Sequence, residues 1–277
     1  MNITQTDKAE VFRSLHNRNG IFVIPNPWDA GSAKILASLG FEALATTSAG
    51  LAFSLGKPDG EGAVTRTEAL RNAGEIAMAV GIPVSADLEN GYGHEPEVCA
   101  ETVFLAAEHG LAGCSIEDNS GNPKDPIYEF DHAVERIKAA VQAARSLPFP
   151  FTLTARAENL ICGRHDLKDT IKRLEAFADA GADVLFAPGL KTKQEIEAVV
   201  RAVAPKPVNV VLGLGQTSMT VGELGELGVK RISIGSALAR AAYGAFTQAA
   251  QEISKKGTFT FTKETTPYKD FNDLFRK

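Results

Sequence analysis

The amino-acid sequence predicts an α/β fold, a single (β/α)8 TIM barrel over residues 1–277. Short apolar runs alternate with longer amphipathic stretches eight times along the chain. Such alternation implies parallel strands joined by right-handed crossovers, and eight units favour a closed barrel over an open sheet. The length of 277 residues is also close to the roughly 250 that one barrel takes. With no linker or low-complexity tract, we expect one domain.

The expected elements follow in chain order. The eight apolar runs, read as strands, are residues 21–24, 43–46, 83–87, 113–117, 151–156, 183–186, 207–211 and 231–234. The amphipathic stretches, read as helices, are 30–39, 66–80, 96–109, 131–144, 167–180, 193–202, 221–227 and 236–254. We further expect an extra N-terminal helix over residues 4–19 and a C-terminal appendage over residues 258–277.

Start and stop signals support these helices. Glycine, the common residue at a helix C-terminus, precedes several expected strands at Gly40, Gly81, Gly110, Gly181 and Gly228. Thr65 and Glu68 have capping-box spacing at the start of the helix 66–80, and Pro96 suits a first helical turn.

Composition excludes several classes of protein. The net charge is −5 and no basic stripe carries interleaved aromatic residues, so we expect no nucleic-acid partner. No apolar run reaches the roughly 18 residues of a membrane span, and the N-terminus lacks signal-peptide features. We therefore expect a cytoplasmic protein without a membrane partner. Its cysteines (Cys99, Cys114 and Cys162) lack CxxC spacing and are expected to be reduced thiols.

Polar residues gather where the expected strands end, which is where barrel enzymes place their active sites. These residues are Asn26 after the first strand, Ser48 after the second, Asp87 and Glu89 at the third, Glu117 at the fourth, Arg156 and Glu158 at the fifth, and Asn209 in the seventh. The sequence therefore predicts a functional site at this rim.

Three carboxylates at this rim indicate a metal site. Asp87 and Glu89 share a strand face, and Glu117 ends the next strand, so the three should crowd together. Like charges so close are costly unless a cation or protons neutralise them. A hard divalent ion suits such oxygen ligands, so we expect Mg2+, with Mn2+ as a possible substitute. In the alternative interpretation these acids form salt bridges with Arg156 and with neighbouring helix residues.

Two features of the rim suit an anionic substrate. The guanidinium of Arg156 matches the geometry of a carboxylate, although Arg156 could instead form a structural pair with Glu158 or Glu117. The turn after the second strand offers small side chains and backbone N–H groups that could hold an anion. The substrate-binding residues expected here are Ser48, Ala49, Gly50, Leu51, Arg156, Glu158 and Asn209.

Four motifs resemble the phosphoenolpyruvate mutase/isocitrate lyase superfamily. Ser85-Ala-Asp-Leu-Glu-Asn-Gly-Tyr-Gly93 is similar to its Asp-x-Asp/Glu-x-Gly-Tyr-Gly signature. Ser115-Ile-Glu-Asp118, Thr154-Ala-Arg-Ala-Glu158 and Ser54-Leu-Gly-Lys-Pro-Asp59 resemble three further motifs of the group. The match runs in order from about Asn26 to Gly235, which is most of the chain.

The resemblance implies roles for these residues. Asp87, Glu89 and Glu117 would hold Mg2+ directly or through water, with Asp59 behind them. Arg156 would bind the substrate carboxylate, and residues 48–51 would meet the same end of the substrate. The group's usual assembly is a homotetramer whose barrels exchange the eighth helix, here residues 236–254.

The loop after the fourth strand departs from the family pattern. It reads Asp118-Asn-Ser-Gly-Asn-Pro-Lys-Asp-Pro126, without the Lys-Lys-Cys-Gly-His of isocitrate and methylisocitrate lyases. The Lys-Leu-Phe-Pro-Lys-Thr-Asn pattern of the mutase loop is absent too. We therefore do not expect isocitrate lyase activity, and the absent mutase loop argues against phosphonopyruvate mutase activity. Asn119 and Asn122 are the expected catalytic side chains of a loop that closes over the site.

Together these features predict a magnesium-dependent lyase. A small 2-oxo or 2-hydroxy carboxylic acid would chelate the metal, and C–C cleavage would give a metal-stabilised enolate. Two alternatives stay open: a C–P bond enzyme of the phosphonopyruvate mutase or hydrolase type, and a non-catalytic barrel that binds an oxoacid.

Overall fold

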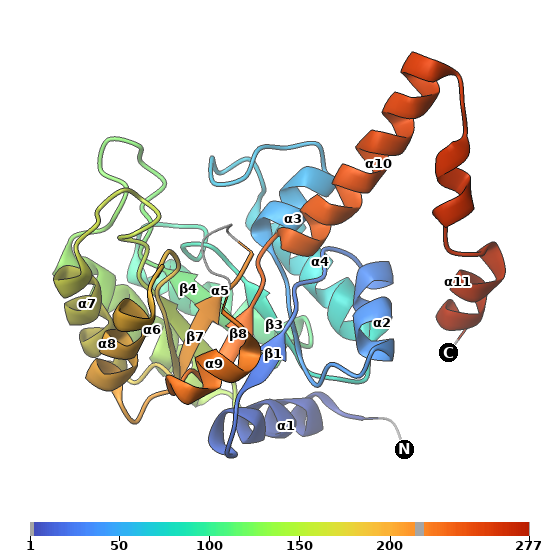
Figure 1. Cartoon of the computed structure of the whole chain (residues 1–277). Helices are drawn as coiled ribbons and strands as arrows, with labels where there is room; N and C mark the ends of the chain where they lie inside the picture. The colour runs from blue at the N-terminus through green and yellow to red at the C-terminus, as the bar shows by residue number, and fades with distance from the viewer. Residues whose placement is uncertain (1–2, 214–218, 277) are drawn as a thin grey trace.

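A computed structural model describes residues 3–213 and 219–276 and has the predicted (β/α)8 architecture (Figure 1). Its sheet has eight strands in the order β1-β8-β7-β6-β5-β4-β3-β2, and every pairing is parallel. The strands are β1 (Phe22–Ile24), β2 (Leu44–Ala45), β3 (Val84–Asp87), β4 (Gly113–Glu117), β5 (Thr152–Arg156), β6 (Val184–Phe186), β7 (Val208–Val211) and β8 (Arg231–Ser233). The predicted fold class is confirmed.

Helices surround the strands (Figure 1). They are α1 (Gln5–Asn17), α2 (Ala30–Ser38), α3 (Ser48–Ser54), α4 (Arg66–Ala79), α5 (Pro96–Glu108), α6 (Phe130–Ser146), α7 (Leu167–Asp179), α8 (Lys193–Val203), α9 (Val221–Glu226), α10 (Ala237–Lys256), the 3-10 helix η1 (Thr260–Glu264) and α11 (Tyr268–Phe275). The capping box predicted at Thr65 and Glu68 starts α4. No helix of the described ranges is long and apolar enough to cross a membrane.

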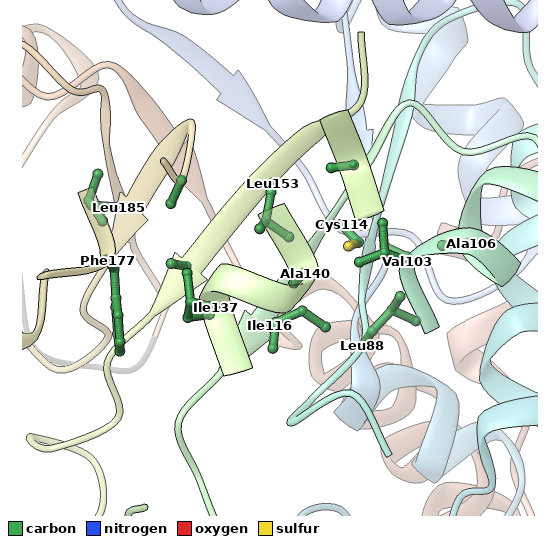
Figure 2. Packing of buried hydrophobic residues seen from close by; sticks show 14 of the residues in the cluster. Leu88, Val103, Ala106, Cys114, Ile116, Ile137, Ala140, Leu153, Phe177 and Leu185 are labelled. Atoms are coloured by element: carbon green, nitrogen blue, oxygen red, sulfur yellow. The ribbon is translucent and has the colours of Figure 1, made fainter. Parts of the chain in front are cut away.

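Strand alternation separates the core from the barrel interior. On β5, Leu153 and Ala155 belong to the main apolar core, whereas Thr154 and Arg156 face the interior. The same alternation on β4 places Cys114 and Ile116 in that core and leaves Glu117 with the polar groups. Figure 2 shows Ile116 and Leu153 near side chains of α5 and α6. The period-two pattern therefore directs the acids and Arg156 toward one interior site.

The barrel closes between β1 and β2 with little main-chain pairing. One backbone hydrogen bond joins them, from Ala45 N to Pro25 O at 3.1 Å. Asn26 strengthens this seam, because its Nδ2 donates to Thr46 O at 2.9 Å. Its Oδ1 accepts from the two backbone N–H groups that follow β8, at 2.9 and 3.0 Å. One amide side chain thus ties the ends of β1, β2 and β8 together.

One segment differs from the sequence-based prediction. The turn expected at residues 47–51 is the start of helix α3, because the hydroxyl of Thr47 accepts from Gly50 N and caps it. The eighth helix, α10, extends away from the barrel and carries η1 and α11 at its far end (Figure 1). Ala239 is the only buried residue within α10. The C-terminal segment returns to the barrel at α2, where Lys34 Nζ donates to Phe275 O at 3.1 Å.

Candidate active site

A cavity of about 220 Å3 lies at the C-terminal ends of the strands. Seven of the residues predicted from the sequence line it: Asn26, Ser48, Ala49, Asp59, Asp87, Arg156 and Asn209. A second cavity, of about 530 Å3, is lined by Glu89, Glu117 and Asn119 and by the segment that precedes α4. The predicted rim residues therefore border two neighbouring spaces.

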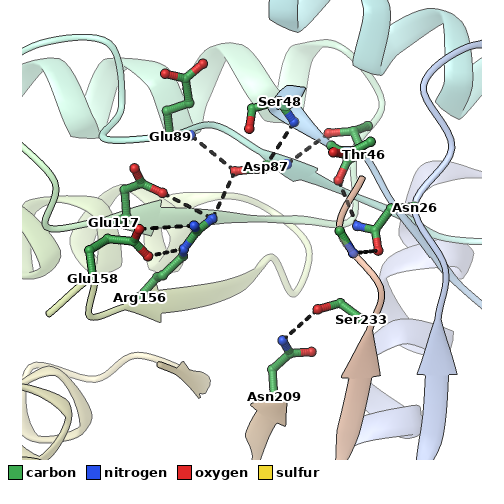
Figure 3. Close-up of polar contacts among 12 residues, drawn as sticks. Asn26, Thr46, Ser48, Asp87, Glu89, Glu117, Arg156, Glu158, Asn209 and Ser233 are labelled. Atoms are coloured by element: carbon green, nitrogen blue, oxygen red, sulfur yellow. Dashed lines mark hydrogen bonds and ion pairs between the residues drawn. The ribbon is translucent and has the colours of Figure 1, made fainter. Parts of the chain in front are cut away.

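Arg156 joins the carboxylates of this rim (Figure 3). Its Nη1 lies 3.1 Å from Glu117 Oε2 and 3.7 Å from Asp87 Oδ1. Its Nε and Nη2 both donate to Glu158, the second at 3.2 Å to Oε2. The ring of Phe186 lies on the guanidinium, with Cζ 5.2 Å from its centre. One cation thus contacts acids from β3, β4 and the end of β5, as in the salt-bridge alternative of the sequence analysis.

Burial perturbs the ionisation of these acids. Burial, followed by the charges of Asp87 and Asp59, raises the pKa of Glu89 to about 7. Burial also raises the pKa of Glu117 well above its ordinary range, although the Arg156 charge opposes this. The pKa of Glu158 rises for the same reason, to about 7. Burial disfavours the charged form of Arg156, but its carboxylate partners outweigh that effect and raise its pKa. The carboxyl groups around Arg156 are therefore more numerous than one guanidinium can neutralise.

The backbone around β3 holds two of these acids in place. Asp87 N donates to Thr46 Oγ1 at 2.9 Å, and Asp87 Oδ2 accepts from Ser48 N at 3.2 Å. Glu89 has a left-handed backbone with φ of 47°, an unusual conformation for a residue with a side chain. Its carbonyl accepts from Glu117 N at 2.9 Å, and Tyr92 Oη lies 3.4 Å from its carboxylate. Cross-strand hydrogen bonds thus maintain this strained turn at the rim.

Other predicted site residues lie elsewhere. Leu51 is buried in a small apolar cluster with Ala52, and Gly50 packs against Trp28 and Thr47, so neither lines the cavity. Of the predicted anion-binding turn, residues 47–51, the first three residues line the cavity: Thr47, Ser48 and Ala49.

The loop after β4 is compact. Asn119 and Ile127 form an antiparallel bridge, and Ser120 N donates to Pro126 O at 2.9 Å. The Oδ1 atoms of Asn119 and Asn122 accept from N–H groups of the same loop, at 2.7 and 3.0 Å. The structure thus uses both asparagines to shape the loop, and Asn122 lines neither cavity. The thiol of Cys162, not proposed as catalytic, lies 3.7 Å from Asn119 Nδ2.

Three buried arginines were missed by the sequence analysis. Arg136 of α6 donates to backbone carbonyls of the loop after β3, including Gly93 O at 2.6 Å. Arg173 of α7 lies 3.1 Å from Asp118 Oδ2 and donates to Tyr128 O at 2.9 Å. Arg231 of β8 donates to Asn209 Oδ1 at 2.8 Å. Arg136 and Arg173 occupy the apolar stripes of their helices, the one signal that could have revealed them.

The donor set fits a divalent cation in charge and chemistry. Within residues 3–213 and 219–276 no three His, Cys, Asp or Glu side chains are grouped as ligands of a metal ion. The carboxylates of Asp87 and Glu117 instead turn toward Arg156. Even so, burial and the neighbouring carboxylates raise the pKa values of Glu89 and Glu117 more than the charge of Arg156 lowers them. Carboxylate oxygens are the ligands that Mg2+ prefers. Asp87, Glu89 and Glu117 therefore suit such an ion.

Comparisons with known proteins agree with the motifs. The family model for phosphoenolpyruvate phosphomutase matches residues 12–254. An uncharacterised protein of Mycobacterium tuberculosis is 36% identical over 249 residues, 88% of each chain. A probable 2-methylisocitrate lyase of Corynebacterium glutamicum is 29% identical over 266 residues, covering 93% of this chain and 84% of the relative.

Solved structures show the same similarity. A putative lyase/mutase from Burkholderia cenocepacia is 58% identical with a TM-score of 0.95, over 99% of this chain and 97% of that chain. Oxaloacetate acetylhydrolase in complex with oxalate is 30% identical with a TM-score of 0.88, over 98% and 94% of the two chains. A 2,3-dimethylmalate lyase is 32% identical with a TM-score of 0.86, over 97% and 93%.

Proposed function

The chain belongs to the phosphoenolpyruvate mutase family, and we propose that it is a magnesium-dependent carbon–carbon lyase for a small 2-oxo or 2-hydroxy carboxylic acid. The observation that carries this proposal is Arg156, whose guanidinium is held at the barrel mouth beside Asp87 and Glu117. Relatives named for the cleavage of methylisocitrate, dimethylmalate and oxaloacetate support C–C chemistry.

Arg156 binds the substrate carboxylate in this proposal. Glu158 holds two of its nitrogens, so the guanidinium plane is fixed before the substrate arrives. The remaining nitrogen, Nη1, faces Asp87 and Glu117 and is the one nearest the metal-binding acids. Ser48 and Ala49 add the start of α3 to the same wall of the cavity. Much of the rate gain is therefore orientation of the substrate before the bond breaks.

Asp87, Glu89 and Glu117 would hold the metal. Asp59 would lie next to these ligands without binding the metal itself. When bound, Mg2+ supplies Lewis-acid stabilisation of negative charge on the substrate. Asp87 is kept in position because its carboxylate accepts from Ser48 N and its own N–H donates to the hydroxyl of Thr46. Arg156 then faces the charge that develops near the substrate carboxylate as the C–C bond breaks, and it stabilises the enolate product electrostatically.

The proposal is tested by a turnover screen with Mg2+ across oxaloacetate, alkylmalates, methylisocitrate and phosphonopyruvate. We expect turnover of at least one carbon–carbon substrate and none of phosphonopyruvate. Turnover of phosphonopyruvate alone would instead assign the chain to C–P chemistry. Binding of these acids without any turnover would indicate an oxoacid-binding protein.

We also propose that the whole chain is one catalytic domain that assembles through α10. This helix has one buried residue, while Phe246 is 71% exposed and Ile253 is 41% exposed. Exposed apolar side chains on a projecting helix are typical of a subunit interface. A homotetramer that exchanges this helix would cover them. Light scattering of the purified protein tests this, with Phe246→Glu as the variant expected to dissociate it.

A further inference from the structure

The turn that carries Glu89 has an unusual backbone conformation. Glu89, Gly91 and Tyr92 are all left-handed, with φ of 47°, 81° and 62°. This conformation is costly for a residue with a side chain, and it persists only where neighbouring groups hold it. The contacts of residues 89–94, here called the metal-side turn, therefore decide where Glu89 lies.

Strands β3 and β4 hold the start of the metal-side turn. Glu89 N donates to Asp87 Oδ1 at 3.4 Å (Figure 3). Leu88 N donates to Ser115 O at 3.3 Å, and Glu89 O accepts from Glu117 N at 2.9 Å. These contacts end at Glu89, so the left-handed residues that follow it depend on other partners.

Arg136 of α6 holds the rest of the metal-side turn. Its side chain is buried, with the residue 1% exposed. Nη1 donates to Gly93 O at 2.6 Å and also to His94 O, and Nη2 donates to Asn90 O. One guanidinium thus binds three carbonyls of the turn. Because the guanidinium is planar and rigid, it fixes the positions of these carbonyls relative to one another.

The guanidinium of Arg136 is itself held in place. The ring of Tyr128 lies over it, with Arg136 Cζ 4.2 Å from the ring centre. The Tyr128 hydroxyl lies 2.7 Å from His94 Nδ1, and His132 Nε2 lies 2.9 Å from His94 O. Arg136 Nε has no acceptor in the described part of the chain, and a buried donor without an acceptor is costly. The guanidinium is therefore oriented to suit the turn and not to satisfy all of its own donors.

Thr102 of α5 adds one contact to the middle of the metal-side turn. This residue is fully buried, and its Oγ1 donates to Gly91 O at 2.8 Å. Gly91 lies between the left-handed residues Glu89 and Tyr92. Two helices, α5 and α6, thus hold the strained backbone that follows Glu89.

We propose that Arg136 is a positioning residue of the metal site, which holds the metal-side turn so that Glu89 faces the same ion as Asp87 and Glu117. This inference rests on the proposed function, because it takes Glu89 as a metal ligand. Arg136 contacts neither the metal nor the substrate in this proposal. It acts through the backbone next to Glu89. Groups that orient metal ligands in this way change metal affinity about tenfold to a hundredfold when they are replaced.

Titration of the metal-free full chain with Mg2+, followed by calorimetry, tests this inference. Arg136→Lys keeps the charge but replaces the planar fork with a compact ammonium group. We expect this variant to bind Mg2+ about tenfold more weakly or worse. The electron paramagnetic resonance spectrum of bound Mn2+ should also change, because it reports the arrangement of the ligands. A purely structural role of Arg136 would lower Tm and leave both the affinity and the spectrum of the folded variant unchanged.

Arg145→Lys is the matched control. Arg145 also belongs to α6 and also donates to a backbone carbonyl, Gly181 O at 2.9 Å. It pairs with Asp183 at 2.6 Å, and both partners precede β6, at the end of the barrel opposite the active site. This variant should lose stability in a thermal unfolding curve and keep the Mg2+ affinity of the native protein.

Thr102→Val provides a second variant with a milder change. It keeps the shape of the side chain and removes the hydrogen bond to Gly91 O. We expect Mg2+ affinity to fall about threefold, the effect of one hydrogen bond. This variant keeps the test decisive if thermal unfolding shows that Arg136→Lys does not fold.

The outcomes separate this inference from the proposed function. A folded Arg136→Lys variant with native Mg2+ affinity and a native Mn2+ spectrum would overturn the role of Arg136 and leave the proposed metal site intact. Unchanged affinity in Thr102→Val would do the same if Arg136→Lys does not fold. An equal loss of affinity in Arg145→Lys would also overturn the inference, because any loss of stability would then weaken the site. A native protein that binds no Mg2+ would instead overturn the metal site of the proposed function, and this inference with it.

Discussion

Two arginines of the barrel interior, Arg156 and Arg231, lie in opposite electrostatic surroundings. Arg156 contacts carboxylates of Asp87, Glu117 and Glu158, whereas Arg231 contacts neutral groups in the described part of the chain. The pKa of Arg156 is accordingly raised, and that of Arg231 is lowered to about 9. One side of the cavity therefore has an excess of negative charge and the other an excess of positive charge.

Removal of metal should have the largest effect on this arrangement. We expect EDTA to abolish turnover and Mg2+ or Mn2+ to restore it, because the acids around Arg156 lack sufficient positive charge. Asp87→Ala should lower kcat/KM at least about a hundredfold and weaken Mg2+ binding. The measurement is turnover against free Mg2+ concentration. Full activity of the metal-free protein would refute the assignment of the acidic side.

Arg156→Lys should have the next largest effect. A lysine keeps the charge but cannot replace a planar fork that Glu158 holds at two nitrogens. We expect oxalate, which resembles the enolate of pyruvate, to inhibit competitively and to lose affinity about tenfold or more in this variant. Inhibition constants with and without Mg2+ provide the measurement. Inhibition that depends on neither Mg2+ nor Arg156 would show that the substrate carboxylate binds elsewhere.

The stability of the metal-free protein should fall as pH rises. The pKa of Glu89 is about 7 in the folded protein against an ordinary 4.5, so the folded state retains a proton that the unfolded chain releases. Its contribution is present below pH 4.5 and is lost as pH rises through about 7. We expect Tm to fall on the order of 5 °C from pH 5 to pH 8. Scanning calorimetry measures this shift.

Glu89→Gln is the control, because an amide does not titrate. The fall in Tm should be smaller in this variant, and saturating Mg2+ should raise Tm of the native protein more at pH 8 than at pH 5. A Tm that rises with pH in the metal-free protein would show that these acids are not protonated as proposed.

The loop after β4 should have the smallest effect. Asn119→Ala should lower kcat a few-fold, about threefold to tenfold, without changing Mg2+ affinity, because Asn119 lines a cavity and caps the loop. Asn122→Ala, at the exposed tip, is the matched control and should change kcat less. Cys162→Ser should change it less than about threefold. A large loss of turnover by folded Cys162→Ser would identify a thiol acid on the negative side of the cavity.

The fold could be predicted from the sequence because its signals are local and repeated. Alternating runs on β3, β4 and β5 already show which side chains face inward, and that is enough to place Asp87, Glu117 and Arg156 at one rim. What could not be predicted is the set of partners each side chain takes. Arg156 contacts three acids at once because the barrel curves them around it, and no spacing along the chain encodes that curvature.

The missed residues have a common physical cause. An arginine on an apolar helix stripe is usually taken for a boundary position, since a long side chain can reach solvent. Arg136 and Arg173 instead extend inward to backbone carbonyls that exist only in the folded barrel. Helix α3 was missed because Ser48–Leu51 contains small residues typical of turns, and the Thr47 cap that starts it is a weak signal by itself.

The seam held by Asn26 should open before any other part of the ring. Elsewhere neighbouring strands share main-chain ladders, but β1 and β2 share one backbone hydrogen bond and a side-chain amide. β1 reaches its ladder partner β8 only across more than two hundred residues of chain, as in the pair Val23 and Ile232. A contact between segments so far apart in the chain forms slowly during folding. The few hydrogen bonds between β1 and β2 also give this seam a low free energy of local opening. The amide protons of Ala45 and Ile234 should therefore exchange with deuterium earlier than those of β4 and β5, and Asn26→Ala should hasten that exchange while leaving the opposite wall of the barrel protected.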